Sequence, residues 1–186
     1  MVLIPRRWLL LGLLGLGACL PKQDAPVVAP QAMEATMSAV LQRLDSGGLS
    51  TVPEELAERL DAQLTARNLT PKPPAGDAVA AFSTRQTSPQ RMAWLAEQEG
   101  PGGLLVLVAT QVEFYSQMNG RWRWTVSVEL TVAPSGDLGQ AVSSSFTVPV
   151  FMQFHHQKEP EALVEASPVI ERELGYLLDQ VLSGMQ

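Results

Sequence analysis

Cysteine is almost absent from this sequence of 186 residues, which contains one, Cys19. A single thiol excludes every disulfide within the chain, so packing of side chains must stabilise the fold. A lone free thiol is also a liability in an oxidising compartment. The position of Cys19 therefore calls for an explanation.

Signatures of common enzymes are missing as well. The sequence has no Gly-x-Ser-x-Gly or Ser-x-x-Lys pattern, which are typical of serine nucleophiles, and no Gly-x-x-x-x-Gly-Lys phosphate loop. Its many carboxylates lie on predicted helices, where such runs are usually solvated. We therefore expect no catalytic residues and no cofactor.

Histidine occurs only twice, as the neighbours His155 and His156. Adjacent residues of an extended segment face opposite ways, so this pair is poorly placed to share one metal ion. Glu159 and Glu161 lie nearby, which leaves a metal site as the less favoured alternative. We expect a solvated loop here and no metal.

Basic residues are outnumbered, with 13 Lys and Arg against 19 Asp and Glu and a net charge of −6. A general nucleic-acid binder needs a basic face that displaces counterions from the phosphates. The acidic balance therefore argues against nucleic acid as the partner.

No apolar run is long enough to cross a membrane, since a spanning helix needs about 20 apolar residues. The longest run near the N-terminus covers eleven residues, from Trp8 to Ala18, and follows Arg6 and Arg7. Two cations, a short apolar core and small residues before a cleavage site are typical of an export signal. The arginine pair also occurs in twin-arginine signals, but the very apolar core favours general secretion.

The end of this run, Leu16-Gly17-Ala18-Cys19, resembles the bacterial lipobox. The resemblance implies cleavage after Ala18 and attachment of acyl chains, palmitate among them, to Cys19. Two or three chains hold a protein on a membrane without a spanning helix. Leu20, where an aspartate would favour retention in the inner membrane, implies a lipoprotein on the outer membrane that faces the periplasm. An ordinary signal peptide with an unmodified cysteine is the alternative.

Three segments follow from this interpretation: a signal peptide over 1–18, a lipidated cysteine with a proline-rich tether over 19–32, and one periplasmic domain over 33–186. Removal of the signal leaves 11 basic residues against 19 acidic ones, a balance of −8. The remaining 168 residues are enough for one domain with a real core.

The first half of the domain shows helical spacing of apolar residues at about 33–45 and again over 51–68. A capping box of Thr51 with Glu54 should start the second helix, and Asn68 suits its C-terminal end. We expect a loop at 69–76, a short strand at 77–82, and a third helix over 89–98 that Ser88 and Pro89 begin.

The centre of the chain, 104–152, predicts a meander of three strands with turns at Asn119-Gly120 and at 134–137. Its middle strand alternates, with Trp122 and Trp124 on the apolar side and Arg121 and Arg123 on the polar side. The run from Leu104 to Val108 is apolar throughout, so the first strand should start buried on both faces.

A long C-terminal helix is predicted over 161–183, where Pro168 either kinks it or starts a new helix. A sheet with one apolar face needs helices on that face. The expected fold is therefore an α+β two-layer domain, with a mainly antiparallel meander sheet of three to four strands and helices packed on one face.

The segments "WLAEQEGPGGLLVLV" (94–108) and "VAPSGDLGQ" (132–140) stand in an element order that resembles one group of periplasmic domains. The group includes the penicillin-binding-protein activator LpoB, the curli-secretion lipoprotein CsgG and the TolB N-terminal domain. The resemblance spans roughly residues 51–183 and is one of pattern. It implies a non-catalytic envelope domain that binds another protein. The long insertions that build the curli pore are not seen, so a pore is not expected.

The leading hypothesis is thus an envelope interaction or assembly factor. The polar side of the meander is the predicted partner face, formed by five residues: Arg121, Arg123, Thr125, Glu129 and Tyr115. The tryptophans should belong to the core, although a glycan or nucleic-acid platform is an alternative. A carrier of lipid or lipopolysaccharide, with a cavity beside Trp122 and Trp124, is the second hypothesis, and an envelope hydrolase is the third.

Overall fold

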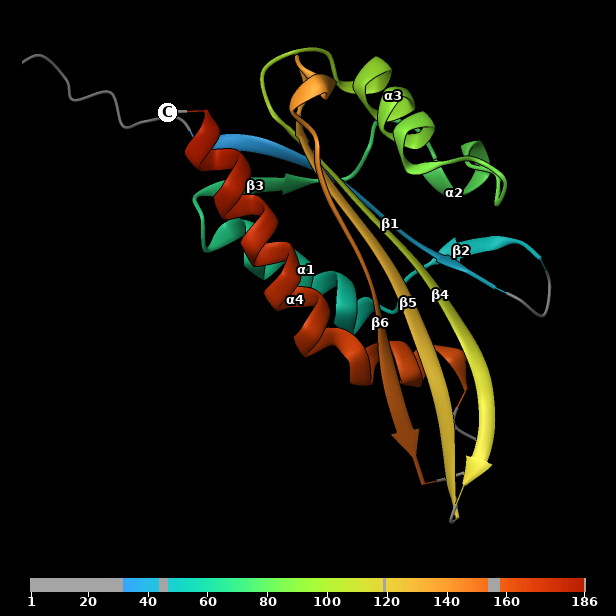
Figure 1. Cartoon of the computed structure of the whole chain (residues 1–186). Coiled ribbons are helices and arrows are strands. Elements are labelled where there is room, and N and C mark those ends of the chain that lie inside the picture. Colours follow the sequence, from blue (N-terminus) through green and yellow to red (C-terminus); the bar gives the residue numbers. More distant parts are fainter. Residues whose placement is uncertain (1–31, 44–46, 119, 154–157, 186) are drawn as a thin grey trace, which may run out of the picture. The chain divides into compact units, whose positions relative to one another are not determined.

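Three long antiparallel strands form the centre of the computed structural model, which describes residues 32–43, 47–118, 120–153 and 158–185 (Figure 1). These strands are β4 (Leu104–Met118), β5 (Arg121–Pro134) and β6 (Val142–Met152). β5 pairs with β4 on one side and with β6 on the other. The predicted meander is therefore confirmed.

Of the two predicted turns of the meander, one lies wholly within the described residues and the other only in part. At Pro134 the turn is confirmed, because the N–H of Asp137 donates to the Pro134 carbonyl over 3.1 Å. A short 3₁₀ turn, η1 (Leu138–Gln140), follows it before β6. Asn119 of the other turn lies outside the described residues, and its neighbour Gly120 has a φ of 73°, which glycine adopts without strain.

The first described element is a strand, β1 (Met33–Gln42), so the helix predicted at 33–45 is wrong. β1 lies inside the sheet and runs parallel to β4, with Ala35 opposite Leu104 and Gln42 opposite Gln111. The sequence of β1 does alternate, with apolar residues at 33, 35, 37, 39 and 41 and polar ones at 34, 36, 38 and 42. Its apolar residues happen to match helical spacing as well.

Two short strands flank β1 on its other edge. β2 (Leu49–Thr51) pairs antiparallel with Val40–Gln42, and β3 (Leu69–Lys72) pairs parallel with Met33–Thr36. The loop predicted at 69–76 thus begins with a strand. The strand predicted at 77–82 is instead a one-turn helix, α2 (Ala78–Ala81), because Asp77 Oδ1 accepts the N–H of Ala80 over 3.2 Å and caps it.

The main core lies between the sheet and two helices, α1 (Glu54–Thr65) and α4 (Glu159–Gly184). Both helices were predicted, and α4 continues through Pro168 as one helix. Leu56, Leu60 and Leu64 of α1 are completely buried, and each contributes roughly 1.5–3 kcal/mol to folding. The side chains of β5 that alternate with its polar ones complete this core, namely Val126, Val128, Leu130 and Val132.

A second, smaller core lies on the opposite face of the sheet. Leu105, Leu107 and Ala133 pack there against α2 and against Met92 and Leu95 of α3 (Ser88–Glu99). The α+β class is confirmed, but the sheet has six strands and the helices cover both of its faces. Helices on the second face are needed because the run 104–108 is apolar on both sides and has no polar side to present to water.

Helix ends follow the prediction only in part. Thr51 belongs to β2, and Pro53 precedes α1 without a side-chain cap, so the predicted capping box is wrong. α3 starts one residue early, after Thr87, whose N–H donates to Gln90 Oε1 over 2.9 Å. Asn68 has a φ of 59°, which confirms the left-handed end predicted after α1.

Candidate functional site: the aromatic tip of the sheet

The ends of β4, β5 and β6 run past the first turns of α4, where no helix covers either face of the ribbon (Figure 1). Five large apolar side chains of the described residues are strongly exposed, and three of them lie here. They are Phe114 (48% exposed), Tyr115 (64%) and Phe151 (53%). Together with Trp122 and Arg123 they form what we call the aromatic tip.

The aromatic tip has two faces, and β4 contains a β-bulge there. Phe114 lies opposite Trp124 in the ladder, but the next pair joins Ser116 to Arg123, so Tyr115 is an extra residue. Bulges locally increase strand twist. Because Tyr115 follows Phe114 directly, its ring lies on the other side of the sheet, beside Arg123.

On that side the guanidinium of Arg123 lies between two rings. Its Cζ is 4.5 Å from the centre of the Tyr115 ring and 5.9 Å from the centre of the Phe151 ring, and Phe151 is its cross-strand neighbour on β6. Exposed contacts of this kind are worth about 0.5–1 kcal/mol each. These contacts hold the Arg123 side chain and the two rings in one fixed arrangement at the surface.

The opposite face of the tip joins the main core. The Phe114 ring lies 5.4 Å from that of Trp122 and 5.5 Å from that of Trp124, measured between centres. Trp124 packs at the margin of the main core, and Trp122 is half-buried. The tryptophans therefore face the core side, as predicted, and Phe114 extends that core into solvent.

The five residues of the predicted partner face are not brought together. Tyr115 and Arg123 are in contact, Arg121 is exposed at the end of β5, and Thr125 lies further along the strand. Glu129 is six residues from Arg123, or roughly 20 Å at strand spacing. It shares a pocket of about 260 Å³ with Arg91 of α3.

The two ends of the predicted partner face differ in charge. Burial lowers the pKa of Arg91, and the negative charge of Glu129 acts in the opposite direction. At the tip, neither Arg121 nor Arg123 forms an ion pair with any described carboxylate. Their positive charge is therefore available to a partner, whereas Glu129 already faces a cation of its own chain.

The sequence analysis did not include Phe114 and Phe151. Alternation in β6 places Val150 and Met152 in the core and Phe151 outside, which the sequence alone allows one to read. The same alternation separates Phe114 from Tyr115 in β4. The bulge itself leaves no comparable signal, because it contains neither glycine nor proline.

Several predicted sites fall outside the described residues: Ala18, Cys19, His155 and His156. Within the described ranges, no three His, Cys, Asp or Glu side chains are grouped closely enough to hold a metal ion. The helices of these ranges also lack the combined length and apolar character that crossing a membrane requires.

No protein-family model matches the chain, and no curated protein matches it. Solved structures do resemble it. Rare lipoprotein B from Shewanella oneidensis is 12% identical over 82% of this chain and 92% of that one, with a TM-score of 0.30. The hypothetical protein CT253 from Chlamydia trachomatis is 14% identical over 82% and 99%, with a TM-score of 0.43.

A minor lipoprotein from Acinetobacter baumannii is 10% identical over 81% of this chain and 87% of that one, with a TM-score of 0.33. Two of these three proteins are thus lipoproteins by name. With such identities and TM-scores below 0.5, the likeness does not assign this chain to a family.

Proposed function

We propose that the chain is a lipid-anchored protein of the bacterial outer membrane whose α+β domain is a non-catalytic interaction or assembly factor for another envelope protein. The observation that carries this proposal is the aromatic tip, where Tyr115 and Phe151 flank the guanidinium of Arg123, which has no ion pair with a described carboxylate. The lipobox-like sequence before Cys19 and the patterned resemblance to periplasmic interaction domains support it.

A protein partner suits the chemistry of the tip. Tyrosine, phenylalanine and arginine are enriched at the centres of protein interfaces, because large rigid rings bury much area and lose little conformational entropy. Rings held by an arginine are already ordered before a partner arrives, which lowers the entropic cost of association. The charge of the tip favours an acidic surface on that partner.

Site-specific photocrosslinking in native envelopes tests this proposal. A photoreactive phenylalanine at position 115 or 151 should give the same adduct, identifiable by mass spectrometry, and one at Tyr176 should not. Tyr176 is the matched control, because it is 62% exposed but lies on α4.

Charge reversal distinguishes a specific adduct from a chance collision. The double change Arg121→Glu and Arg123→Glu should abolish the adduct, whereas Arg85→Glu, in the exposed segment between α2 and α3, should leave it intact. An adduct that survives the double change, or that forms equally from position 176, would show that the tip is not the partner surface.

The anchor is tested separately with Cys19→Ser. The parent protein should sediment with membranes and carry the mass of its acyl chains, and the variant should do neither. If both proteins sedimented and had the same mature mass apart from the single oxygen-for-sulfur exchange, the lipoprotein assignment would be wrong.

The lipid-carrier hypothesis needs a cavity beside the tryptophans. Two pockets, of about 420 and 260 Å³, lie in the described part of the chain, and neither is lined by Trp122 or Trp124. Nothing in the described residues therefore favours the carrier over the interaction factor.

A further inference from the structure

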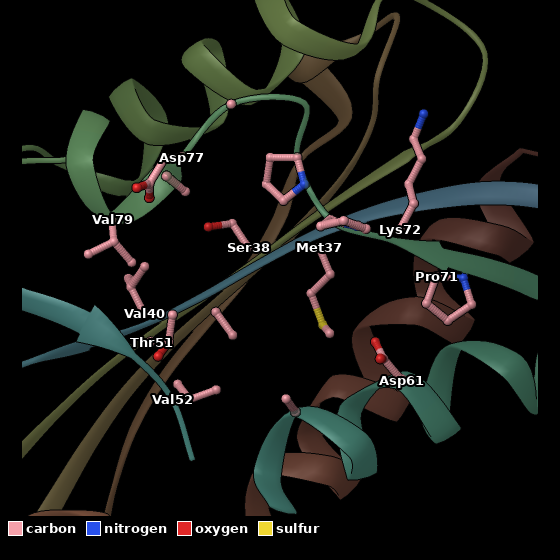
Figure 2. A pocket seen from close by; sticks show the side chains of 16 residues that line it. Met37, Ser38, Val40, Thr51, Val52, Asp61, Pro71, Lys72, Asp77 and Val79 are labelled. Atoms are coloured by element: carbon pink, nitrogen blue, oxygen red, sulfur yellow. The ribbon is translucent and has the colours of Figure 1, made fainter. Parts of the chain in front are cut away.

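The outer edge of β1 is interrupted. β3 pairs with Met33–Thr36 and β2 pairs with Val40–Gln42, so among the described strands Met37, Ser38 and Ala39 pair only with β4, on the inner side. Figure 2 shows β1 crossing behind this opening, with the end of β2 on one side and β3 on the other. We call Met37–Ala39 the β1 gap.

Neighbouring hydrogen bonds show which backbone groups face the gap. The N–H of Arg43 donates to Gly48 over 2.9 Å, on the β2 side, whereas the carbonyl of Val40 accepts from Thr110 Oγ1 of β4 over 3.0 Å. Successive residues of a strand direct their backbone groups to opposite edges. Odd-numbered residues therefore face outward. The Met37 N–H and the Ala39 C=O complete the ladders with β3 and β2, at the pairs Thr36–Lys72 and Val40–Thr51, so the Met37 C=O and the Ala39 N–H are presented to the gap.

The gap is the back wall of a pocket of about 420 Å³. Its sides are mainly apolar. They are formed by Val52 and Ala57, before and on α1, Val79 on α2, Pro71 on β3, and Pro74 on the segment after β3. An extended chain advances about 3.3 Å per residue, so three added residues would span the gap. A short strand with small or apolar side chains fits these dimensions.

The rim of the pocket is acidic. Asp61 of α1 and Asp77 both line it, and Figure 2 shows the Asp61 carboxylate on the same side of β1 as the Met37 side chain. The cation that also lines the pocket is Lys72, but its Nζ is committed to Glu34 (2.8 Å) and Glu99 (2.7 Å). Asp61 has no cationic partner among the described side chains, and burial raises its pKa.

One polar atom of the lining has no partner. Ser38, which is 3% exposed, lies within the gap, and its Oγ forms no hydrogen bond. A buried hydroxyl without a partner is destabilising, because it has lost its hydrogen bonds to water. The unpartnered hydroxyl of Ser38 and the open outer edge therefore lie at the same place on β1.

We propose that the β1 gap binds a short extended peptide with a basic side chain, supplied by a partner protein. The peptide adds to the edge of β1 through the backbone groups of Met37 and Ala39, and its Lys or Arg pairs with Asp61. Strand addition of this kind takes its affinity from main-chain hydrogen bonds and its specificity from alternate side chains. This site is separate from the aromatic tip and does not depend on it.

Fluorescence anisotropy on the mature chain tests the proposal with labelled Val-Lys-Val-Lys-Val and its counterpart Val-Glu-Val-Glu-Val. The lysine peptide should bind at least tenfold more tightly than the glutamate peptide. The peptide amides form two alternating sets, and only one set can donate to the gap. N-methylation of that set should abolish binding, and N-methylation of the other set should not. Asp61→Asn should weaken the lysine peptide about tenfold.

Glu58→Gln is the matched control, because Glu58 is an exposed acid on the same helix that does not line the pocket. It should leave the affinity unchanged. Hydrogen exchange gives a second readout: the peptide should slow exchange at the Ala39 amide, while the amides of Met37, which pairs with β3, and Ser38, which faces β4, are slow throughout.

Three results would overturn the proposal. The first is no binding of the lysine peptide, and the second is binding that neither Asp61→Asn nor N-methylation weakens. The third is binding that appears only after residues 20–31 are replaced by a Gly-Ser linker, which would make the protein's own tether the occupant instead of a partner.

Discussion

Arg67, just after α1, and Asp179 on α4 form a two-pronged ion pair, with Nε 2.7 Å from Oδ1 and Nη2 3.0 Å from Oδ2. Nη2 of Arg67 also donates to the carbonyl of Gly175 over 3.2 Å. The pair joins the two helices that cover the main core, and it lies at the edge of their contact, where water still reaches the carboxylate.

Asp179→Asn should therefore destabilise the domain modestly and only at neutral pH. The hydrogen bonds from Arg67 lower the pKa of Asp179 below its ordinary value in the folded state. Stability from such a group is present above the unfolded pKa, about 3.9, and is lost as the pH falls through the folded value. An exposed pair contributes at most about 1 kcal/mol.

Urea unfolding at pH 7 and pH 3 measures this. The difference in unfolding free energy between the parent and Asp179→Asn should shrink at the lower pH. Glu58→Gln, which removes an unpaired acid, should show no such difference. If the difference in unfolding free energy between parent and variant were the same at both pH values, the ion pair would not be its source.

Ser135→Ala should cost about 1–3 kcal/mol of unfolding free energy. Ser135 Oγ accepts the N–H groups of both Gly102 and Gly103, each over 2.9 Å, and the alanine variant leaves these part-buried donors without their acceptor. Chemical denaturation measures the loss, and Ser145→Ala on the exposed side of β6 is the control, expected within about 0.5 kcal/mol of the parent. Equal effects of the two changes would refute the assigned role of Ser135.

Gly103→Ala should be clearly destabilising, by about 1–3 kcal/mol. A Cβ at this position would lie 2.7 Å from the carbonyl oxygen of Glu34 on β1, and a backbone atom cannot move aside without disturbing the β1–β4 pairing. Gly136→Ala is the matched control, since its Cβ would meet only Pro101 at an ordinary 3.8 Å. Thermal unfolding should separate the two variants by several degrees.

Phe114→Ala should lower stability by about 1 kcal/mol and shift tryptophan emission to longer wavelength. The ring of Phe114 covers Trp122 and Trp124, and ring pairs of this kind contribute about 0.5–1.5 kcal/mol beyond their buried area. Phe151→Ala, on the other face of the tip, should leave the emission unchanged. An equal spectral shift in both variants would contradict the two-faced arrangement.

The meander was predictable because the polar and apolar residues of β5 alternate, and alternation fixes both the strand and its buried face. β1 was missed although it alternates, because Met33, Met37, Val40, Leu41 and Leu44 also recur at helical spacing. β3 was missed for another reason: it contains Pro71, which is compatible only with an edge strand, and β3 pairs with β1 alone.

Part of the candidate site followed from the same alternation. It places Arg121 and Arg123 on one side of β5 and the tryptophans on the other, and the structure agrees. It also places Tyr115 on the side of Arg123, where the two are in contact. It cannot show that Glu129 faces Arg91, because that contact depends on where α3 docks. The β1 gap depends on two strands that were both predicted otherwise.

The position of β1 inside the sheet governs the order in which the domain can assemble. Every pair that it makes with β4 spans 69 positions, from Ala35–Leu104 to Gln42–Gln111. Contacts between residues this far apart in the sequence form slowly, because a long loop must close before the contacts can stabilise the fold. A chain that emerges from its N-terminus can thus pair β1 only with the short strands β2 and β3 until β4 has followed, so the central sheet closes late.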